Sequence, residues 1–411
     1  MQIFADMQAR YLKKLLPTMP AHCTCISIIG DRYDIDSSKS LKADERIRRQ
    51  QIKQSSRTYE IKDNLPIPQW KAFILNHKNK AALQNYLANS WTTHHKAMPQ
   101  GVKLILGGLF KEADKAVVIT TDGQEVLSEL ACGDHEEADT RIFSHINYCV
   151  AQYGYTRVVI QATDTDILIL AIYYSVRIHG LQELWVHKGS THLPCHNIAG
   201  MLADKFSLPV LLATSALLCG HIMSGCDAVS YAFRKGKKKL FKVAMITASD
   251  LKDMMKFGDD SLVVSDAVIG SCRTFFMKLY SDFSGNLDDL RAHIFGRKLP
   301  PTESAHKYHM LRGLYQIAIC KRSHQCVLSL PDATSFGRQL LKGHLVPIMM
   351  DKPAKPPVVK QKQHCQCSKS KCTRNCSCAT AGVSCVIACK CSNKVMTISK
   401  FALLCDFNCP L

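Results

Sequence analysis

Short runs of β-forming residues alternate with helical patterns along the first half of the chain, and this alternation constrains the fold most strongly. It is typical of an α/β protein with a mostly parallel sheet and helices on both faces. The strands are predicted at 23–29, 102–106, 116–120, 155–162 and 183–187. The helices are predicted at 3–16, 66–91, 141–152 and 198–206, and residues 245–345 are expected to be predominantly helical.

Acidic residues follow or flank these apolar runs at four places. They are Asp31, Glu137 with Asp139, Asp164 with Asp166, and Asp227. Because α/β proteins build their sites at the carboxyl ends of strands, we expect the six side chains to gather at one edge of the sheet. Carboxylates so close together repel one another unless cations lie between them, and such oxygen ligands select Mg²⁺ or Mn²⁺.

The local spacing allows each acidic pair to bind a cation, but no pair is diagnostic alone. Asp164 and Asp166 are two residues apart in a segment predicted to be extended, so both can point to one side. Glu137 and Asp139 are predicted in the first turn of a helix, where the dipole favours negative charge. An Asp at a strand end is more often a turn former, and Glu136 is interpreted as a helix-start residue. Only the ordered set indicates a site.

The overall charge indicates an anionic partner. The chain has 411 residues, with 53 Lys and Arg against 34 Asp and Glu, and a formal charge of +19. This excess favours nucleic acid or an anionic membrane surface. The longest apolar run, 208–219, is interrupted by Thr214 and Ser215 and is too short to span a bilayer. The N-terminus does not resemble a signal peptide, so we expect a cytosolic or nuclear protein and no membrane association.

Twenty cysteines are unevenly distributed, and eight of them form a dense cluster near the C-terminus. The cluster consists of Cys365, Cys367, Cys372, Cys376, Cys378, Cys385, Cys389 and Cys391. In a reducing compartment this spacing predicts zinc ligation rather than disulfides. The segment has no apolar core, so zinc would supply its folding energy. A Pro/Lys-rich stretch after Met350 predicts a linker. The predicted domains are 1–345, a linker at 346–364, and a zinc module at 365–411.

The ordered acids, with Gly236-Lys237-Lys238 behind them, resemble the flap-endonuclease/XPG-type 5′-nucleases of the PIN-like superfamily over roughly residues 20 to 245. The resemblance implies one metal ion held by Asp31, Glu137 and Asp139, and a second held by Asp164, Asp166 and Asp227. Two ions about 4 Å apart would activate a water and stabilise the leaving oxygen of a phosphodiester, with no protein nucleophile.

The same resemblance assigns roles to basic residues. It places Lys39, Lys42, Arg46, Arg48 and Arg49 over the scissile phosphate, where cations stabilise developing charge. It places Lys235, Gly236, Lys237 and Lys238 in a hairpin that contacts the phosphates of the duplex backbone and does not recognise base sequence. The sequence departs from the family pattern in two respects. An N-terminal strand with a further metal-binding Asp does not precede Asp31, and Arg234 stands where a second glycine is expected.

The cysteine cluster resembles the tesmin-type CXC domain, which binds DNA and shares its cysteines among several zinc ions. The resemblance implies phosphate contacts through Lys369, Lys371 and Arg374. Asn375 stands where the family has an aromatic residue, and Lys394 stands where its last cysteine falls.

Together these features predict a nuclear, Mg²⁺- or Mn²⁺-dependent nuclease that selects DNA, or RNA, by structure and carries a Zn²⁺ module. The combination resembles proteins carried by or derived from mobile elements. One alternative is a catalytically inactive protein that uses the nuclease fold and the CXC module only to bind DNA. Another is a structural zinc-assembly protein.

Overall fold

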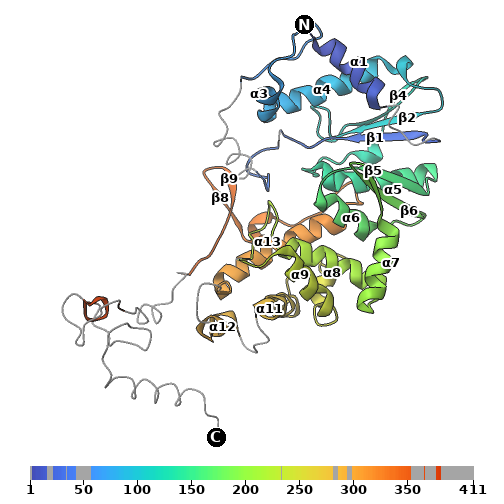
Figure 1. Ribbon diagram of the computed structural model, residues 1–411. Helices are drawn as coiled ribbons and strands as arrows, with labels where there is room; N and C mark the ends of the chain where they lie inside the picture. The colour runs from blue at the N-terminus through green and yellow to red at the C-terminus, as the bar shows by residue number, and fades with distance from the viewer. Residues whose placement is uncertain are drawn as a thin grey trace. The chain divides into compact units, whose positions relative to one another are not determined.

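The computed structural model (Figure 1) divides the chain into two units, Met1–Met349 and Met350–Leu411. It describes residues 2–15, 22–33, 35–42, 57–232, 234–280, 286–293, 299–352, 365 and 376–380. The first unit is a mixed α/β structure with small sheets. In the second unit the described residues include one short helix, α15 (Ser377–Thr380).

The first sheet has the order β1-β2-β3-β4. Its strands are β1 (Cys25–Ile29), β2 (Lys103–Gly107), β3 (Ala116–Thr120) and β4 (Gly123–Val126). Helices α1 (Phe4–Leu15), α3 (Trp70–Leu75) and α4 (His77–Thr93) lie beside it (Figure 1). Leu104 and Leu106 pack with Trp91 of α4, whereas Ile105 between them packs with Cys149 on the other side. This alternation follows from the two-residue period of a strand.

The second sheet has the order β5-β6-β7. It is made of β5 (Arg157–Gln161), β6 (Glu183–Lys188) and β7 (Thr191–Pro194). The helices that precede, connect and follow these strands are α5 (Ala138–Tyr153), α6 (Thr165–Tyr174) and α7 (Cys195–Phe206). Phe143 of α5 stacks on Tyr174 of α6, with ring centroids 4.7 Å apart. Both belong to the largest apolar core, which continues into the helical part of the unit.

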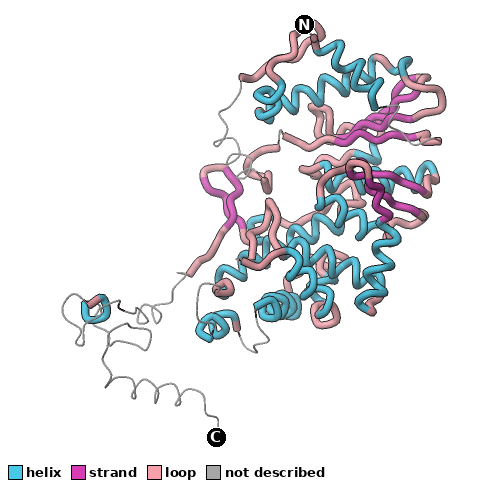
Figure 2. Tube along the Cα trace, in the orientation of Figure 1, coloured by secondary structure: helices cyan, strands magenta, loops and turns pink. Residues whose placement is uncertain are grey.

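The helical part follows α7. Its helices are α8 (Val210–Met223), α9 (Lys237–Ile246), α10 (Lys252–Lys256), α11 (Asp266–Tyr280), α12 (Leu287–His293) and α13 (Glu303–Arg322). A hairpin of β8 (Arg338–Leu341) and β9 (His344–Pro347) follows and lies apart from both sheets (Figure 2). Three 3₁₀ turns are His95–Ala97, Ser128–Leu130 and Ala333–Phe336. No single described helix is long and apolar enough to cross a membrane. Helices α7 and α8 together reach that length and apolarity, but the chain bends by 97° between them.

The strand pairing differs from the expected mostly parallel sheet. Among the described residues, parallel pairing is confined to β1–β2 and β5–β6, and the other four strand pairs are antiparallel. The physical reason is the length of the connections. Thr121-Asp122 alone joins β3 to β4, and Gly189-Ser190 joins β6 to β7. Parallel strands need a long crossover, so connections of two residues can join only antiparallel neighbours.

Two further predictions differ locally from the structure. The helix predicted at 66–91 is two helices, because Asn76 ends α3 and caps α4 by accepting a hydrogen bond from the Lys78 amide at 2.9 Å. The segment predicted to be extended around Asp164 and Asp166 is instead the start of α6. The region 245–345 is mainly helical as expected, but it ends in the β8–β9 hairpin.

Candidate active site

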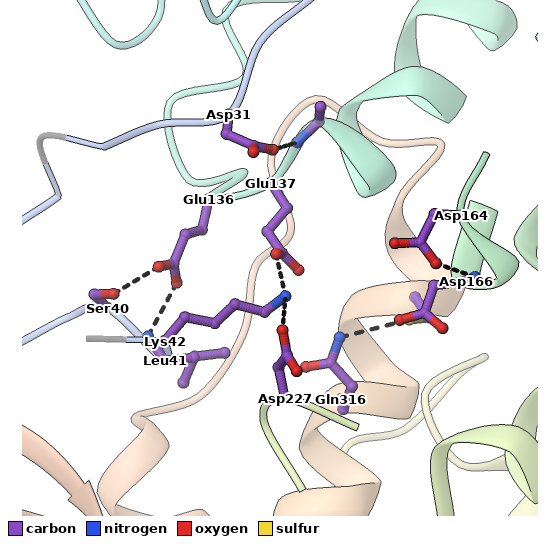
Figure 3. A network of polar contacts seen from close by, with 12 residues as sticks. Asp31, Ser40, Leu41, Lys42, Glu136, Glu137, Asp164, Asp166, Asp227 and Gln316 are labelled. Atoms are coloured by element: carbon purple, nitrogen blue, oxygen red, sulfur yellow. Dashed lines mark hydrogen bonds and ion pairs between the residues drawn. The ribbon is translucent and has the colours of Figure 1, made fainter. Parts of the chain in front are cut away.

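The ammonium group of Lys42 lies among carboxylates at the centre of the candidate site (Figure 3). It forms an ion pair with Glu137 at the start of α5, and its Nζ lies 3.6 Å from Oδ2 of Asp227. Burial alone would lower the pKa of Lys42, but the surrounding carboxylates, led by Glu137, raise it above its usual value. Lys42 is therefore a fully charged cation between acids from distant segments.

Asp31 connects the end of β1 to the start of α5. Its Oδ1 accepts a hydrogen bond from the Ala138 amide at 2.9 Å, and the Tyr33 hydroxyl donates to its Oδ2 at 3.1 Å. Glu137 is the N-cap residue of α5 but makes no side-chain capping bond. Asp31 thus supplies an acceptor that a helix N-terminus needs, which leaves the Glu137 carboxylate available to Lys42.

Burial and neighbouring negative charge perturb the two acids of α5. Burial first, and then Glu137, Asp31 and Asp164, raise the pKa of Asp139 to about 7. Burial also raises the pKa of Glu137, although Lys42 opposes the shift. Such shifts indicate that the negative charges are crowded and only partly compensated. A bound cation would relieve this repulsion.

Asp164 and Asp166 follow β5 and begin α6. Asp164 caps the helix by accepting a hydrogen bond from the Asp166 amide at 3.0 Å. Oδ1 of Asp166 lies 2.7 Å from Nε2 of His221 in the last turn of α8, and this hydrogen bond lowers the pKa of Asp166. Gln316 of α13 points toward Asp166 as well (Figure 3). The side chains of His221 and Gln316 belong to the site although neither was predicted.

Asp227 lies in a tight turn after α8. Reciprocal backbone hydrogen bonds of 3.1 and 3.0 Å between Cys226 and Val229 close this turn. Gly225 precedes it with φ at 107°, and a Cβ atom there would lie 2.5 Å from the ring of Tyr231. A glycine is therefore required for the chain to present Asp227 to Lys42.

Glu136 anchors the loop that carries Lys42. Its Oε1 accepts a hydrogen bond from the Ser40 hydroxyl at 2.5 Å, and its Oε2 accepts one from the Leu41 amide at 2.9 Å (Figure 3). Its backbone carbonyl accepts from the Arg32 amide at 3.0 Å. The sequence around Glu136 predicts only a helix-start residue, because nothing in its local pattern indicates contacts with residues about a hundred positions away.

Arg338 of β8 joins the two loops that carry Lys42 and Asp227. Its guanidinium, 4% exposed, donates to the carbonyl of Leu41 at 3.3 Å and to that of Ala228 at 2.9 Å. These carbonyls belong to the direct neighbours of the two charged residues. No sequence motif indicated this role for Arg338.

The predicted basic residues have different surroundings. Lys39 is exposed on the turn after Asp36, outside the carboxylate cluster. Lys235 lies with its ammonium 4.4 Å from the ring centre of Tyr280. Gly236 is the N-cap residue of α9, and Lys237 and Lys238 are exposed in its first turn. Lys237 is close enough to help lower the pKa of Asp166. Arg46, Arg48 and Arg49 lie outside the described residues.

Cys365, Cys376 and Cys378 in the second unit form a group whose ligand atoms all lie within 4.8 Å of one another. All three are buried, and thiolates are ligands that suit zinc, so the donor set fits this ion. In the part of the chain that the structure describes, no three carboxylates meet the same distance. The remaining predicted residues of the module lie outside the described residues: Cys367, Cys372, Cys385, Cys389, Cys391, Lys369, Lys371 and Arg374.

Comparisons with protein-family models, with curated proteins and with solved structures found no match for this chain.

Proposed function

We propose that the chain is a Mg²⁺- or Mn²⁺-dependent phosphodiester hydrolase with a PIN-like architecture. Its proposed substrate is nucleic acid, with DNA preferred to RNA. One observation carries the proposal. Carboxylates that follow β1, β5 and α8 and that begin α5 gather near the ammonium of Lys42. Mg²⁺ and Mn²⁺ bind groups of closely spaced oxygen ligands whose negative charge is not fully compensated.

The metal and the side chains would contribute differently. A bound divalent ion lowers the pKa of a water and stabilises an oxygen leaving phosphorus. Lys42 would balance the negative charge of a bound phosphate, since the surrounding carboxylates keep its ammonium charged. Burial and the neighbouring acids raise the pKa of Asp139 to about 7, and a bound cation would lower this pKa so that the carboxylate can act as a ligand. The exposed Lys237 and Lys238 would contact backbone phosphates, as a positively charged helix start does.

The cysteine group supports a separate role in binding. A Zn²⁺ ion held by Cys365, Cys376, Cys378 and a further thiolate would fold the second unit. With a chain charge of +19, a folded zinc module would add affinity for nucleic acid rather than catalysis. We place such a protein in the nucleus on this basis.

A specific observation favours a second candidate, a protein that binds nucleic acid without cleaving it. Lys42 already compensates Glu137 and Asp227, and among the described residues no three carboxylates approach within 4.8 Å. In this alternative the ion pairs hold the loops together, and the acids bind one ion or none.

Cleavage assays on the full-length chain separate the two candidates. Flap, nicked and single-stranded DNA are incubated with the protein in Mg²⁺, in Mn²⁺ and in EDTA. Asp164→Asn with Asp166→Asn is the test variant, because Asn caps a helix as well as Asp does and the fold should survive. Asp250→Asn with Asp253→Asn, two exposed acids outside the cluster, is the charge-matched control.

We expect metal-dependent cleavage by the wild type and by the control, and a loss of about a hundredfold or more in the test variant, with DNA binding retained. If none of the three substrates is cleaved in either metal while DNA still binds, the enzyme proposal fails and the binding-only candidate replaces it.

A further inference from the structure

The first unit contains a cavity of about 420 Å³, and none of the carboxylates of the candidate active site lines it. Five helices form its walls: α5 through Asn147, α6 through Tyr173, α8 through Leu211, α10 through Lys252 and Lys256, and α13 through Arg322. Its volume is within the range of pockets that hold small organic ligands.

The cavity and the carboxylate cluster lie at opposite ends of the same helices. Asp166 is in the first turn of α6 and Tyr173 is near its end, about 10 Å away along the axis. Helix α8 runs the other way, since Leu211 near its start lines the cavity and His221 in its last turn contacts Asp166. The cavity is therefore a site distinct from the candidate active site.

Positive charge predominates in the lining. The five cationic residues are Arg177, Lys252, Lys256, Lys321 and Arg322, and the only carboxylate among the lining residues is that of Asp259. Lys321, 4% exposed, donates to Oδ1 of Asp259 at 2.9 Å, so these two charges offset each other. The other four cations leave the cavity strongly positive, and a concave wall focuses such a field on an entering anion.

Arg177 is held rigidly by uncharged groups. Its guanidinium donates to the carbonyls of Tyr173 and Leu211 and to the hydroxyls of Thr214 and Ser215, at 2.7 to 2.9 Å. It also lies 3.7 Å from the centre of the Tyr173 ring. These contacts fix the side chain and use all four of its Nη hydrogens but do not neutralise its charge, so Arg177 attracts an anion through that charge rather than through a bidentate hydrogen bond.

Arg322 adds a second cation whose neighbours are neutral. Its Nη1 donates to the carbonyls of Leu328 and Ser329 at 3.4 and 3.2 Å. Its Nε is buried and has no hydrogen-bond partner among the residues that the structure describes. A buried guanidinium N–H without an acceptor is costly, and an anion in the cavity is one way to satisfy it.

The lining also includes the polar side chains of Asn147, Ser215, His324 and Gln325, and an apolar part. The apolar part includes Ile178, Leu212 and Met255 as well as Leu211 and the Tyr173 ring. Inorganic phosphate would contact only the cationic side chains, whereas a phosphate attached to a flat organic ring would contact both the cationic and the apolar side chains. We propose that this cavity binds a nucleoside monophosphate, with its phosphate held by Arg177, Arg322 and the lysines of α10 and its base against the apolar side chains.

Calorimetric titration of the full-length chain with adenosine monophosphate tests the proposal, with EDTA present so that no metal-dependent binding at the carboxylates contributes. Adenosine and inorganic phosphate are titrated separately. The test variant is Lys252→Ala with Lys256→Ala, two exposed residues of α10. Its matched control is Lys13→Ala with Lys14→Ala, an equally exposed pair on α1.

We expect the wild type and the control to bind adenosine monophosphate at least tenfold more tightly than adenosine or inorganic phosphate. The α10 variant should bind it about tenfold or more weakly, the change that corresponds to one lost charge-assisted hydrogen bond. Leu211→Glu, at a side chain 52% exposed, adds a negative charge at the cavity and should weaken binding without altering the thermal unfolding of the free protein.

Three results would overturn the proposal. They are the absence of binding at millimolar adenosine monophosphate, equal affinity for adenosine or for inorganic phosphate, and unchanged affinity in both the α10 variant and Leu211→Glu. None of these outcomes depends on the proposed nuclease activity.

Discussion

Replacing Lys42 by Met removes the cation from the candidate site while preserving most of its volume. The side chains of Lys42, Glu137 and Asp227 are 19%, 22% and 35% exposed, so the ion pairs are partly screened by water. Breaking a fully buried pair costs about 3–5 kcal/mol, and an exposed pair contributes about 1 kcal/mol or less. We therefore expect Lys42→Met to lower the free energy of unfolding by about 2 kcal/mol in EDTA, an intermediate value between these limits.

Magnesium should reverse this loss. Without the ammonium, the carboxylates repel one another more strongly and should bind Mg²⁺ more tightly than in the wild type. An ion that binds only the folded state at a concentration a hundred times its dissociation constant stabilises that state by about 2.7 kcal/mol. Urea unfolding in EDTA and across a Mg²⁺ titration measures both effects.

The control for this experiment is Lys239→Met, an exposed lysine of α9. It should change neither the stability in EDTA nor the response to Mg²⁺. If Lys42→Met loses stability but gains nothing more from Mg²⁺ than the control does, the acids are not a cation site and the reasoning from crowded charge is refuted.

Three other predictions follow from the same contacts. The pKa of Asp139 is raised from 3.8 to about 7, so the folded state binds its proton more tightly, and ionisation costs stability as pH rises from about 4 through 7. Asp139→Asn should therefore raise the free energy of unfolding at pH 8, by at most about 4 kcal/mol, and leave it unchanged at pH 4, which urea unfolding at both pH values checks. Arg338→Met should lower the free energy of unfolding by about 2 kcal/mol, because the carbonyls of Leu41 and Ala228 lose a buried donor, and it should reduce cleavage as well; Arg338→Lys should restore part of both. Removal of zinc with a zinc-selective chelator in the presence of Mg²⁺, or Cys376→Ser, should unfold the second unit and weaken DNA binding while cleavage by the first unit persists; circular dichroism, a filter-binding assay and the cleavage assay in Mg²⁺ measure these three effects.

Local elements could be predicted from the sequence because each has its own periodicity. The pattern over residues 3–16 predicted a helix, and α1 spans Phe4–Leu15. The β-rich run at 23–29 predicted a strand, and β1 spans Cys25–Ile29. The partition into separate sheets was missed. It depends on how strands separated by α3, α4 and α6 find partners, and on two-residue turns such as Thr121-Asp122, which impose antiparallel pairing.

The candidate site was predictable to the extent that it lies at strand ends. Asp31 and Asp164 follow β1 and β5 as expected, but these strands belong to different sheets, so the strand ends of a single sheet do not explain why the two carboxylates lie in the same cluster. The side chains that complete the cluster could not be found in this way. They are His221 of α8, Gln316 of α13 and Arg338 of β8. Each lies more than fifty residues along the chain from the acid or loop that it contacts, and the sequence around a polar residue does not indicate which distant residue it contacts.

The electrostatics of the cluster also bear on whether its role is only structural. One lysine and one carboxylate would be enough to join the loop of Lys42 to α5. Here Glu137 and Asp139 are half-buried close to Asp31 and Asp164, and the raised pKa of Asp139 means that ionising it at neutral pH destabilises the fold. Stability alone would favour replacing such an acid by an amide or an apolar residue. We propose that the acid serves a cation site instead, because a divalent cation that binds the carboxylates would remove this cost while it is bound. The Asp139→Asn measurement at pH 8 therefore tests this argument directly, because a variant that is no more stable than the wild type would show that the crowded acids carry no such cost.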